Sequence, residues 1–577
     1  MGSIFSALNI GRLGLLAQQY SMHVLGNNIA NVNTEGYTRR RVVLSPTGSV
    51  QLGSGLVFGT GVKTEDIQRV RDTFLDVYLR NEMGTLGMLD KSSAAYKYIE
   101  LIFNELGDQG RSLSTMMSEF WNAWETLSTE PENTAVRESV ISSGLSLAST
   151  FRYMRERLDG LRLDLNTAVG TTVEEINTLA AQLQELNVQI IAAEDEPHTA
   201  NDLRDRRDLL VDRLSELAAV TTRDFGDGEL AVFINGSLLV SGTTIRTLET
   251  TAGTSGMYAV QWADTGDTVT PSGGELKGLM DSRDVNVPAY ISRVDALATQ
   301  IIKEVNRLHS GGNGLELYEV ATSGIAVTDA DAPLDSGAGL PFEDEITSGG
   351  FYLGAYTTAG NLLLQQWISI TPGTSTLNTV AAEINADFLA TGFLQAYVVS
   401  NRLMIQVGSG APSDTRFSFV GSNGTRDTSG FLLATELNTF FTGEDSETIN
   451  VSSLLQNNAD FLATASSTAP GDNAIALAIG NLRNQTFEIG ADTEARSFDD
   501  YHEVTIATLG AESARESGLC ANQENVVEAF KQQRLAYSGV NLDEELTNLI
   551  SVEHAYTAAA RYISTIDEML ETLVSIT

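Results

Sequence analysis

The chain has 577 residues, with 36 basic against 75 acidic side chains and a net charge of −39. This length allows about three or four domains, and the acidic balance argues against nucleic acid as the main partner, because duplex binding needs clustered Lys and Arg. Strong self-repulsion keeps such a chain in solution, so association must come from buried apolar surface.

The first predicted element is an amphipathic helix that runs to about residue 28. Its apolar stripe recurs every seven residues, at Leu8, Leu15, Met22 and Ile29. The stretch 27–41, NNIANVNTEGYTRRR, follows directly. Positions that tolerate the left-handed conformation closing a helix are Asn27, Asn28, Asn31 and Gly36.

Two further segments complete the N-terminal region, residues 1–63. Residues 37–46 are predicted to be extended and to end at Pro46, and residues 53–62 to form a glycine-rich loop. We expect the region to be an axial helix followed by an extended arm. The residues leave two interpretations open. One is a helix cap followed by a strand, which explains the Asn and Gly; the other is contact of Tyr37 and the three arginines at 39–41 with adjacent subunits.

Residues 64–220 are predicted to form a helical bundle domain. Apolar residues step by three and four at Ile176, Leu179, Leu183, Leu186 and Ile190, which is typical of a coiled-coil-like bundle. Asn201 is a predicted N-cap for the last of these helices.

The apolar period changes from helical to two at about residue 221. Residues 221–286 are predicted to be β-rich, with a hairpin at Asn235-Gly236, because this dipeptide suits a tight two-residue turn. Residues 287–312 are predicted to return to the bundle as a helix, and residues 313–470 to form an inserted β-rich outer domain with strands pairing around 400–402.

Residues 471–577 are predicted to be C-terminal helices that complete the bundle and the axial core. The last helix, about 540–576, carries an unbroken heptad seam of Leu549, Val552, Tyr556, Ala559, Ile563, Ile566, Leu570 and Leu573. The predicted fold class is therefore α+β and multidomain, in which the terminal helices form an α-helical coiled-coil or bundle stalk with inserted β-rich domains.

No catalytic, cofactor-binding or metal-binding constellation is found in the sequence. HEVTI at 502 lacks the second histidine of a zinc protease helix, so a surface histidine is the expected alternative. DADAPLD at 329 has Pro333 and Leu334 where a calcium loop needs a ligand and a glycine, so we expect a solvated acidic loop. Cys520, the single cysteine, is expected to be a packing residue in a helix.

One cysteine excludes an internal disulfide, and no run of about 18 apolar residues is present, so we expect no membrane insertion. The N-terminus lacks a basic leading region, so we expect no cleavable secretory signal. Export, if it occurs, must use another route.

Both ends of the chain carry more apolar surface than one helix pair covers. An apolar heptad stripe is usually ordinary core, but termini tend to fray unless something holds them. The residues expected outside the terminal seam are Ile4, Phe5, Leu13, Leu16, Leu542, Leu546, Ile550, Met569 and Val574. We expect neighbouring subunits to cover them, and a head-to-tail contact repeated without closure builds a helical tube.

In two terminal motifs, the sequence resembles bacterial flagellar rod, hook and hook-associated proteins. The N-terminal motif of that family matches Ala30, Asn31, Thr34, Gly36 and Tyr37. The C-terminal motif is similar over Gly539, Val540, Asn541 and Leu542, and again over DEML at 567–570.

Four internal stretches resemble the hook-associated protein 1 family, whose members form the first junction between hook and filament. They are residues 203–217, 274–284, 305–312 and 471–482. Residues 313–470 are not distinctive, and SVEHAYTAAARYIST (551–565) departs from the Gln and Ser more usual in the family.

The resemblance implies a non-enzymatic structural axial protein, located outside the cell at the hook–filament junction. Its implied partners are other copies of itself in a helical or ring oligomer, the hook protein, a second junction protein leading to the filament, and an export chaperone on the C-terminal helix. Export unfolded by the flagellar type III apparatus is also implied, as is ordering of the terminal helices only on assembly.

The residues expected to carry assembly follow from the two motifs. In the N-terminal motif they are Asn27, Asn28, Ala30, Asn31, Thr34, Gly36, Tyr37 and Arg39. In the C-terminal helix, where the chaperone is also expected, they are Val540, Leu542, Leu546, Leu549, Val552, Tyr556, Ile563, Ile566, Leu570 and Leu573.

Two alternatives remain open from the sequence. Besides the junction protein, one alternative is another axial protein, such as a hook or second junction protein, and the other is a secreted adhesin or hydrolase whose activity lies in residues 313–470. Deleting that interval separates the second alternative, because an adhesin loses binding while a junction protein still builds filaments.

Overall fold

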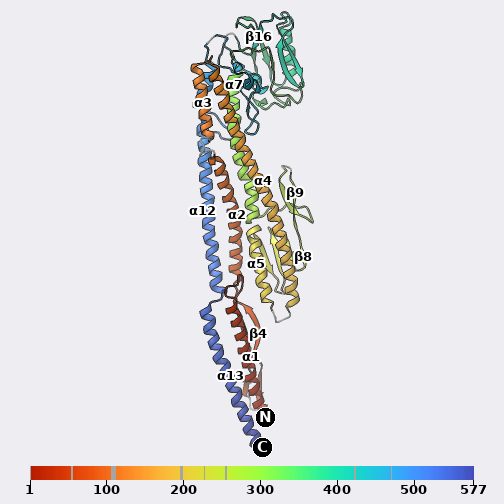
Figure 1. The fold of residues 1–577 in the computed structure, drawn as a ribbon. Coiled ribbons are helices and arrows are strands. Elements are labelled where there is room, and N and C mark those ends of the chain that lie inside the picture. Colours follow the sequence, from red (N-terminus) through yellow and green to blue (C-terminus); the bar gives the residue numbers. More distant parts are fainter. Residues whose placement is uncertain are drawn as a thin grey trace. The chain divides into compact units, whose positions relative to one another are not determined.

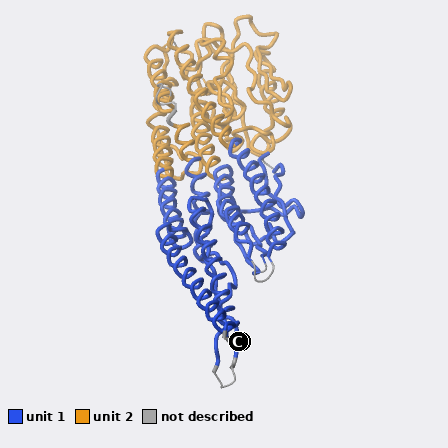
Figure 2. The backbone as a smooth tube through the Cα atoms, turned by 60° about the horizontal axis from the view of Figure 1, so that its bottom comes forward, with its two compact units in different colours: residues 1–95, 163–284, 514–577 blue, residues 96–162, 285–513 orange. Residues whose placement is uncertain are grey.

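The computed structural model describes residues 2–52, 56–105, 112–194, 199–226, 228–253, 256–421, 424–469 and 471–576. The chain forms two compact units (Figure 2): residues 1–95, 163–284 and 514–577 in unit 1, and residues 96–162 and 285–513 in unit 2. Each unit is assembled from separate stretches of the chain, whereas the six predicted ranges are continuous. The predicted α+β class is confirmed, with long terminal helices and small inserted sheets.

In unit 1, helices α1 (Gly2–Ala30) and α13 (Leu542–Ile576) lie side by side with the two termini at the same end (Figure 1). The pair is antiparallel, because Asn28 contacts Glu545 and Gly11 lies against Ile563. A Cβ at Gly11 would stand only 2.7 Å from Ile563 Cγ1, so this glycine sets how closely the helices approach.

The predicted seam of α13 is confirmed as the face that is turned toward α1. Ile566 is buried and Leu573, near the helix end, is 39% exposed. The remaining seam residues are half-buried: Leu549, Val552, Tyr556, Ala559, Ile563 and Leu570.

An arm of four strands follows α1. Strand β1 (Arg40–Pro46) pairs antiparallel with β4 (Val62–Arg69), and β2 (Ser49–Leu52) pairs with β3 (Leu56–Gly59). The predicted extended segment ending at Pro46 is confirmed. The predicted loop over 53–62 is wrong for residues 56–59, because Leu, Val and Phe in this short run favour a strand; residues 53–55 lie outside the described residues.

Four helices form most of the predicted bundle: α2 (Thr73–Glu105), α3 (Leu113–Thr129), α4 (Thr134–Ala193) and α5 (Asn201–Ala218). The helices begin at Thr73 rather than at 64, since β4 occupies residues 62–69. The predicted N-cap at Asn201 is wrong: Ala200 holds that position, and Asn201 Nδ2 donates to Ile67 O at 2.6 Å. Asn201 therefore ties α5 to the arm.

The β-rich part of unit 1 contains a four-stranded sheet in the order β5-β6-β7-β8 and a separate pair, β9 with β10. Their bounds are Val220–Asp224, Leu230–Ile234, Ser237–Ser241, Thr244–Ile245, Leu248–Ala252 and Tyr258–Trp262. The predicted hairpin is confirmed, with Ile234 opposite Ser237 and both Asn235 and Gly236 at positive φ. Helix α6 (Gly274–Asp281) and a π-helical turn η1 (Ser282–Asn286) follow.

In unit 2, the helix predicted within residues 287–312 is confirmed as α7 (Val287–His309), which ends three residues before the predicted bound. Two three-stranded sheets, β11-β15-β14 and β13-β12-β16, and the short pair β17-β18 confirm the β-rich interval. The strands, from β11 to β18, are Val320–Thr322, Gly349–Thr357, Leu362–Ile370, Leu394–Val399, Arg402–Val407, Thr415–Ser418, Phe441–Thr442 and Asn450–Val451. The predicted turn is confirmed, with Ser400 and Asn401 at positive φ.

Short helices also lie between the strands of the β-rich interval and between its end and α12. They are η2 (Glu343–Glu345), α8 (Leu377–Asp387), α9 (Phe431–Ala434), α10 (Ser453–Asn457), η3 (Ala459–Phe461), α11 (Ala474–Gly480) and η4 (Asn481–Asn484). Helix α12 (Phe498–Ser538) then contributes residues to both units before α13 begins.

The histidines divide between core and surface. The expectation of a surface histidine at 502 is wrong, because His502 is 5% exposed and stacks on Phe103. His309 is fully buried, and burial lowers the pKa of both rings to about 4. His23 and His554 are exposed, and His198 lies outside the described residues.

The acidic loop at 329 is solvated as expected, since Asp329 and Asp331 are exposed. Within the described residues, no group of three or more His, Cys, Asp or Glu is placed to hold a metal ion. Among those same residues, no helix has the length and apolar character needed to cross a membrane.

Candidate assembly site

The N-terminal motif surrounds one buried amide, that of Asn28 at the end of α1. Its Nδ2 donates to Glu545 Oε2 and to Arg40 O, both at 2.9 Å. Its Oδ1 accepts from the Tyr37 hydroxyl at 2.9 Å and from Arg40 N at 3.1 Å. Because both donors and both acceptor positions of the amide are used, Asn28 ties α1, the arm and α13 together.

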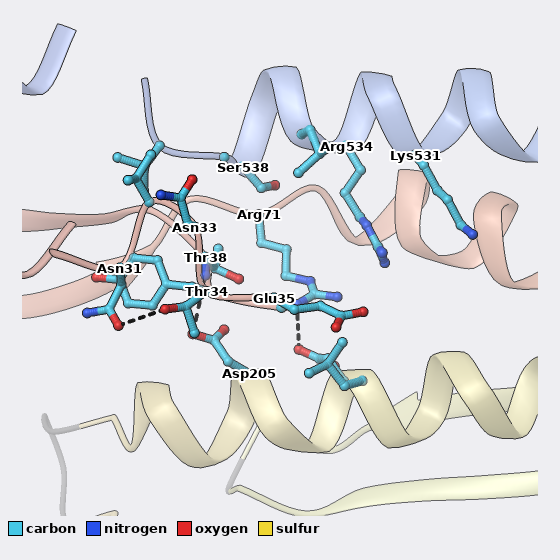
Figure 3. A pocket seen from close by; sticks show the side chains of 18 of the residues that line it. Asn31, Asn33, Thr34, Glu35, Thr38, Arg71, Asp205, Lys531, Arg534 and Ser538 are labelled. Atoms are coloured by element: carbon cyan, nitrogen blue, oxygen red, sulfur yellow. Dashed lines mark hydrogen bonds and ion pairs between the residues drawn. The ribbon is translucent and has the colours of Figure 1, made fainter. Parts of the chain in front are cut away.

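The residues after Asn28 form a compact turn (Figure 3). Asn31 Nδ2 donates to Asn27 O at 2.9 Å, and the Thr34 hydroxyl donates to Asn31 Oδ1 at 3.2 Å. Ala30 is the last residue of α1. Gly36 has a φ of 77°, and a Cβ there would stand 2.5 Å from Leu209 Cδ1.

The expectation that the asparagines adopt the left-handed conformation is wrong. Within residues 27–41, all of which the structure describes, positive φ occurs at Gly36 and not at an asparagine. The asparagine side chains instead form hydrogen bonds at the end of α1, because a short amide can reach the nearby backbone.

The aromatic and basic residues of the motif contact their own chain. The Arg40 guanidinium lies over the Tyr37 ring, 4.8 Å from its centroid, and burial raises the pKa of Tyr37. Arg39 Nη1 pairs with Glu544 Oε2 at 2.9 Å, while Arg39 N donates to Ser538 O at 2.8 Å. Arg39 therefore contacts the start of α13, Tyr37 contacts Asn28 of α1, and Arg40 pairs with Asp202 and Asp205 of α5. The expected contacts of these residues with adjacent subunits stay a prediction.

A charged network lies beneath this turn. Asp205, Asp208 and Asp212 are spaced by three and four residues, which places them on one face of α5. They pair with five arginines. The pairs are Arg40 with Asp205 at 3.3 Å, Arg69 with Asp205 at 2.9 Å, Arg71 with Asp208 at 2.7 Å, Arg80 with Asp212 at 2.7 Å, and Arg534 with Asp212 at 2.6 Å.

Asp208 stands at the centre of the network. Burial by itself raises its pKa, but the positive charges of Arg71, Arg69 and Arg80 outweigh burial and hold the pKa well below its usual range. Residues 203–217 thus carry an acidic face that binds five separate arginines.

A cavity of about 480 Å³ opens between the turn, α5 and the end of α12 (Figure 3). The turn contributes residues 31–38, and the α12–α13 joint contributes Ser538, Gly539 and Val540. Lys531 and Glu35 border it with opposite charges. This mixture suits contact with polypeptide better than a dedicated small-molecule site, because few polar groups converge on one point.

The predicted residues of α13 fall into two sets. The seam residues face α1, whereas Leu542 and Leu546 are 44% and 46% exposed. Ile550 and Met569, expected outside the seam, are 55% and 60% exposed. On α1, Phe5 and Leu16 are exposed as expected, but Ile4 and Leu13 are half-buried, and Leu13 packs against Gly61 of the arm.

Sequence reasoning missed Glu545 and the aspartate–arginine network. The spacing of the three aspartates on one helical face was the available signal for the network. Glu545 lies among three acidic residues at the start of α13, and nothing in that run distinguishes the one that becomes buried.

Three family models match the chain. They are described as flagellar hook-associated protein FlgK helical domain, over residues 97–319; flagellar basal body rod FlgEFG protein C-terminal, over 531–576; and flagella basal body rod protein, over 8–38. The two terminal matches cover the two motifs, and the central match covers most of the predicted bundle.

Curated relatives match over the full length. Flagellar hook-associated protein 1 of Bacillus subtilis (strain 168) is 27% identical over 585 residues, covering 100% of this chain and 99% of the relative. The Salmonella typhimurium protein of the same description is 26% identical over 594 residues, covering 99% and 100%. A solved structure, the flagellar hook junction protein FlgK from Burkholderia pseudomallei, is 17% identical with a TM-score of 0.49, covering 79% of this chain and 99% of that one.

Proposed function

Because the chain belongs to the flagellar hook-associated protein 1 family, we propose that it forms the layer of subunits joining hook to filament and that it assembles through α1 and α13. It is a structural component of the flagellar axial structure, not an enzyme, and its place is extracellular, at the hook–filament junction. The sequence-based alternatives of a hook protein, an adhesin or a hydrolase give way to this assignment.

The observation that carries the proposed assembly route is the apolar surface left on the terminal pair. One seam is closed between α1 and α13, yet Phe5, Leu16, Leu546 and Ile550 stay exposed beside it. Exposed apolar residues concentrated on a terminal helix pair mark a contact surface, since burying them is favourable by about 25 cal/mol per Å².

The motif residues have a positioning role in this proposal. Asn28, Tyr37 and Arg39 hold the first turn of α13 against the end of α1. They thereby set the direction in which α13 leaves α12, while the exposed residues of α13 meet the neighbouring copies.

The specific partners are part of the proposal. One face of the layer contacts the hook protein and the other contacts a second junction protein that leads to the filament. Before export, a chaperone covers the C-terminal helix, whose exposed apolar residues need protection in the cell. Passage unfolded through the type III apparatus agrees with a single cysteine, because no disulfide has to be opened.

The α1–α13 seam is proposed to be marginally stable until neighbours cover it. Most of its residues are only half-buried, so the pair gains less from burial than a core helix does. Amide hydrogen exchange on the isolated protein is expected to show weaker protection over residues 2–30 than over α7; equal protection would contradict the proposal.

A deletion strain tests the function directly. Cells that lack this chain are expected to carry bare hooks in electron micrographs, and the full chain restores filaments. A chain without residues 540–577 is expected to keep a folded unit 2 but to fail to enter the junction. Normal filaments in either the deletion strain or the truncated strain would contradict the proposal.

A further inference from the structure

Helix α12 presents a long exposed face that carries no charge. Between Gly518 and Tyr537 the residues of this face lie in two adjacent rows, spaced by three, four or seven positions, as one helical face requires. One row is Gly518, Asn522, Asn525, Ala529, Gln533 and Ala536, and the other is Leu519, Val526, Phe530 and Tyr537. We call these ten residues the α12 strip.

The strip is an uncharged surface and not part of the core, and its apolar side chains are interspersed with the amides of Asn522, Asn525 and Gln533. Leu519 is 45% exposed, Val526 38% and Tyr537 51%, while Phe530 at its edge is half-buried. At 1.5 Å per residue the strip extends over about 30 Å. Isolated exposed apolar side chains need no explanation, but an uncharged face of this length with Leu519, Val526 and Tyr537 exposed along it marks a contact surface.

Charge is sorted around α12 in a way that supports this interpretation. The acidic residues Glu524 and Glu528 are exposed on the opposite side of the helix. Arg534 is bound to Asp212, and Lys531 borders the cavity described above. In a chain with a net charge of −39, a face of this length without a carboxylate is where two copies can approach with the least repulsion.

The first turns of α2 extend the strip. Phe74, Val77 and Tyr78 are 78%, 49% and 59% exposed. The Tyr78 ring stacks on Phe530 with centroids 6.5 Å apart, above the buried contact of Leu79 and Met83 with Val527. The aromatic shoulder and the strip therefore form one surface across the α2–α12 contact, all within unit 1.

This surface leads into the one already assigned to assembly. Tyr537 precedes the short joint between α12 and α13, and Leu542, Leu546 and Ile550 continue the exposed apolar residues beyond it. A surface that ends at the joint beside the proposed self-assembly residues, and is free of the charge that makes copies repel, fits a second copy of this chain better than an unrelated partner.

We propose that the α12 strip, with Phe74, Val77 and Tyr78, seats an apolar helix face of a neighbouring copy. Contact between subunits then continues from α13 along α12 to the start of α2. This inference rests on the proposed function, and it adds a second contact surface that the terminal helices alone do not supply.

Two alanines of α12 provide a matched test. Ala529 lies in the strip, while Ala521 lies on the acidic side with Glu524 and Glu528, and both are exposed. Complementing the deletion strain with Ala529→Glu is expected to lower the fraction of hooks bearing filaments by at least about tenfold, because a carboxylate is buried between like-charged copies. Ala521→Glu is expected to match the wild type. Equal numbers of filaments for the two variants would overturn the inference.

Two controls separate folding and export from contact. Both variants are expected to give wild-type circular dichroism and wild-type amounts of exported chain. If Ala529→Glu fails in either respect, Val526→Ser, which adds no charge, takes its place, and a wild-type number of filaments for that variant would overturn the inference.

A photo-crosslinking amino acid at position 529 identifies the occupant. Illumination of assembled flagella is expected to yield an adduct of two copies of this chain, and none when the amino acid is at position 521. An adduct with the hook protein, the second junction protein or another protein instead of a second copy would overturn the inference. Filaments in the deletion strain contradict the proposed function itself, so the two failures are distinguishable.

Discussion

Asn28 and Glu545 are separated by 517 positions in the chain, yet the Asn28 amide donates to the Glu545 carboxylate at 2.9 Å and both side chains are buried. The contact joins the end of the first helix to the beginning of the last. It sits beside the α12–α13 joint, where the arm also pairs Arg39 with Glu544. The first and last helices are therefore joined by a buried hydrogen bond beside the α12–α13 joint, and the rest of the α1–α13 seam extends from it toward the termini.

A double-mutant cycle on this pair tests the closure. Asn28→Ala and Glu545→Ala are each expected to lower the free energy of unfolding by about 1–3 kcal/mol, because each leaves a buried partner unsatisfied. Residues in direct contact couple, so the double variant is expected to cost less than the two singles combined. Denaturant unfolding measures all four proteins; strictly additive effects would contradict the contact. Asn33→Ala, at an exposed position, is the control.

Gly36→Ala tests the turn of the N-terminal motif. The φ of 77° and the approach to Leu209 at 2.5 Å both penalise a Cβ, with an expected cost of about 1–3 kcal/mol. Gly48→Ala is the matched control, because a Cβ there meets nothing within 4 Å. The midpoint of thermal unfolding, Tm, is expected to fall by at least about 2 °C for Gly36→Ala and to stay near the wild-type value for Gly48→Ala. A larger fall in Tm for Gly48→Ala would contradict the assigned turn.

Gly11 and Gly14 test the packing of α1 on α13. A Cβ at Gly11 would stand 2.7 Å from Ile563 Cγ1, whereas at Gly14 it meets nothing within 4 Å. Gly11→Ala is expected to separate the helices and reduce filament number in the complemented deletion strain. Gly14→Ala is expected to be neutral or to strengthen α1, since Ala favours a helix over Gly by about 1 kcal/mol. The same filament number for both variants would argue against this seam.

Asp208→Asn tests the charged network. Removing one partner of a buried network leaves three arginines near an uncharged amide, at an expected cost of about 3–5 kcal/mol in the free energy of unfolding. Asp202→Asn is the control, because the Asp202 side chain is 77% exposed and exposed pairs contribute about 0–1 kcal/mol. Equal costs for the two variants, measured by urea unfolding at neutral pH, would contradict a central role for Asp208.

Because of the Asp208 carboxylate, we expect the free energy of unfolding to fall at acid pH. The pKa of Asp208 is held below its usual value in the folded protein, so the unfolded chain takes up this proton first, near pH 4. Stability from Asp208 is therefore complete above about pH 4 and is lost as the pH falls further. Asp208→Asn is expected to show a smaller loss of stability between pH 5 and pH 3 than the wild type, measured by urea unfolding.

His309 predicts a second pH dependence, in unit 2. Its Nδ1 donates to Asn438 O at 2.7 Å and its Nε2 accepts from Ala463 N at 3.0 Å, so the buried ring is neutral. Burial, with the nearby positive charge of Arg137, lowers the pKa of His309 to about 4, and the hydrogen bond to Asn438 opposes that shift only in part.

The unfolded ring takes up a proton near pH 6.5, so stability falls as the pH drops from about 6.5 to about 4, by up to roughly 3 kcal/mol. Tryptophan fluorescence follows the unfolding, because Trp124 lies against His309. His309→Gln is expected to flatten this dependence partly, since His502 contributes in the same direction. The exposed His23→Gln is the control, and an unchanged slope for His309→Gln would contradict the assignment.

Much of the fold followed from local pattern. The helix over 287–309, the Asn235-Gly236 hairpin and the heptad seam of α13 each depend on residues close in sequence, so their periods and turn types identify them. The strand at 56–59 and the cap of α5 were missed for the opposite reason. Glycines on both sides of the strand obscure its alternating pattern. The Asn201 side chain donates a hydrogen bond to Ile67 O, more than a hundred residues away, instead of capping α5.

The candidate site was foreseen in its residues but not in its contacts. The motif residues were identified, and Asn28 and Tyr37 do meet at one point. The structure adds the contacts that Tyr37 and Arg39 make with their own chain, while their predicted contacts with adjacent subunits stay a prediction. The α12 strip was not identified at all, since its apolar residues are diluted by Gly, Ala, Asn and Gln and give no strong helical period.

By itself, the sequence determined the class of this protein: two apolar terminal stripes, a chain too acidic for nucleic acid, and terminal motifs that resemble those of flagellar axial proteins. Tertiary structure alone decided which polar residues are buried, because Asn28, Asp208 and Glu545 become partners only when distant segments are brought together. Local periodicity identifies the apolar face of a helix. The partner of a buried polar group, in contrast, depends on which distant segment packs beside it and supplies a hydrogen bond or an opposite charge.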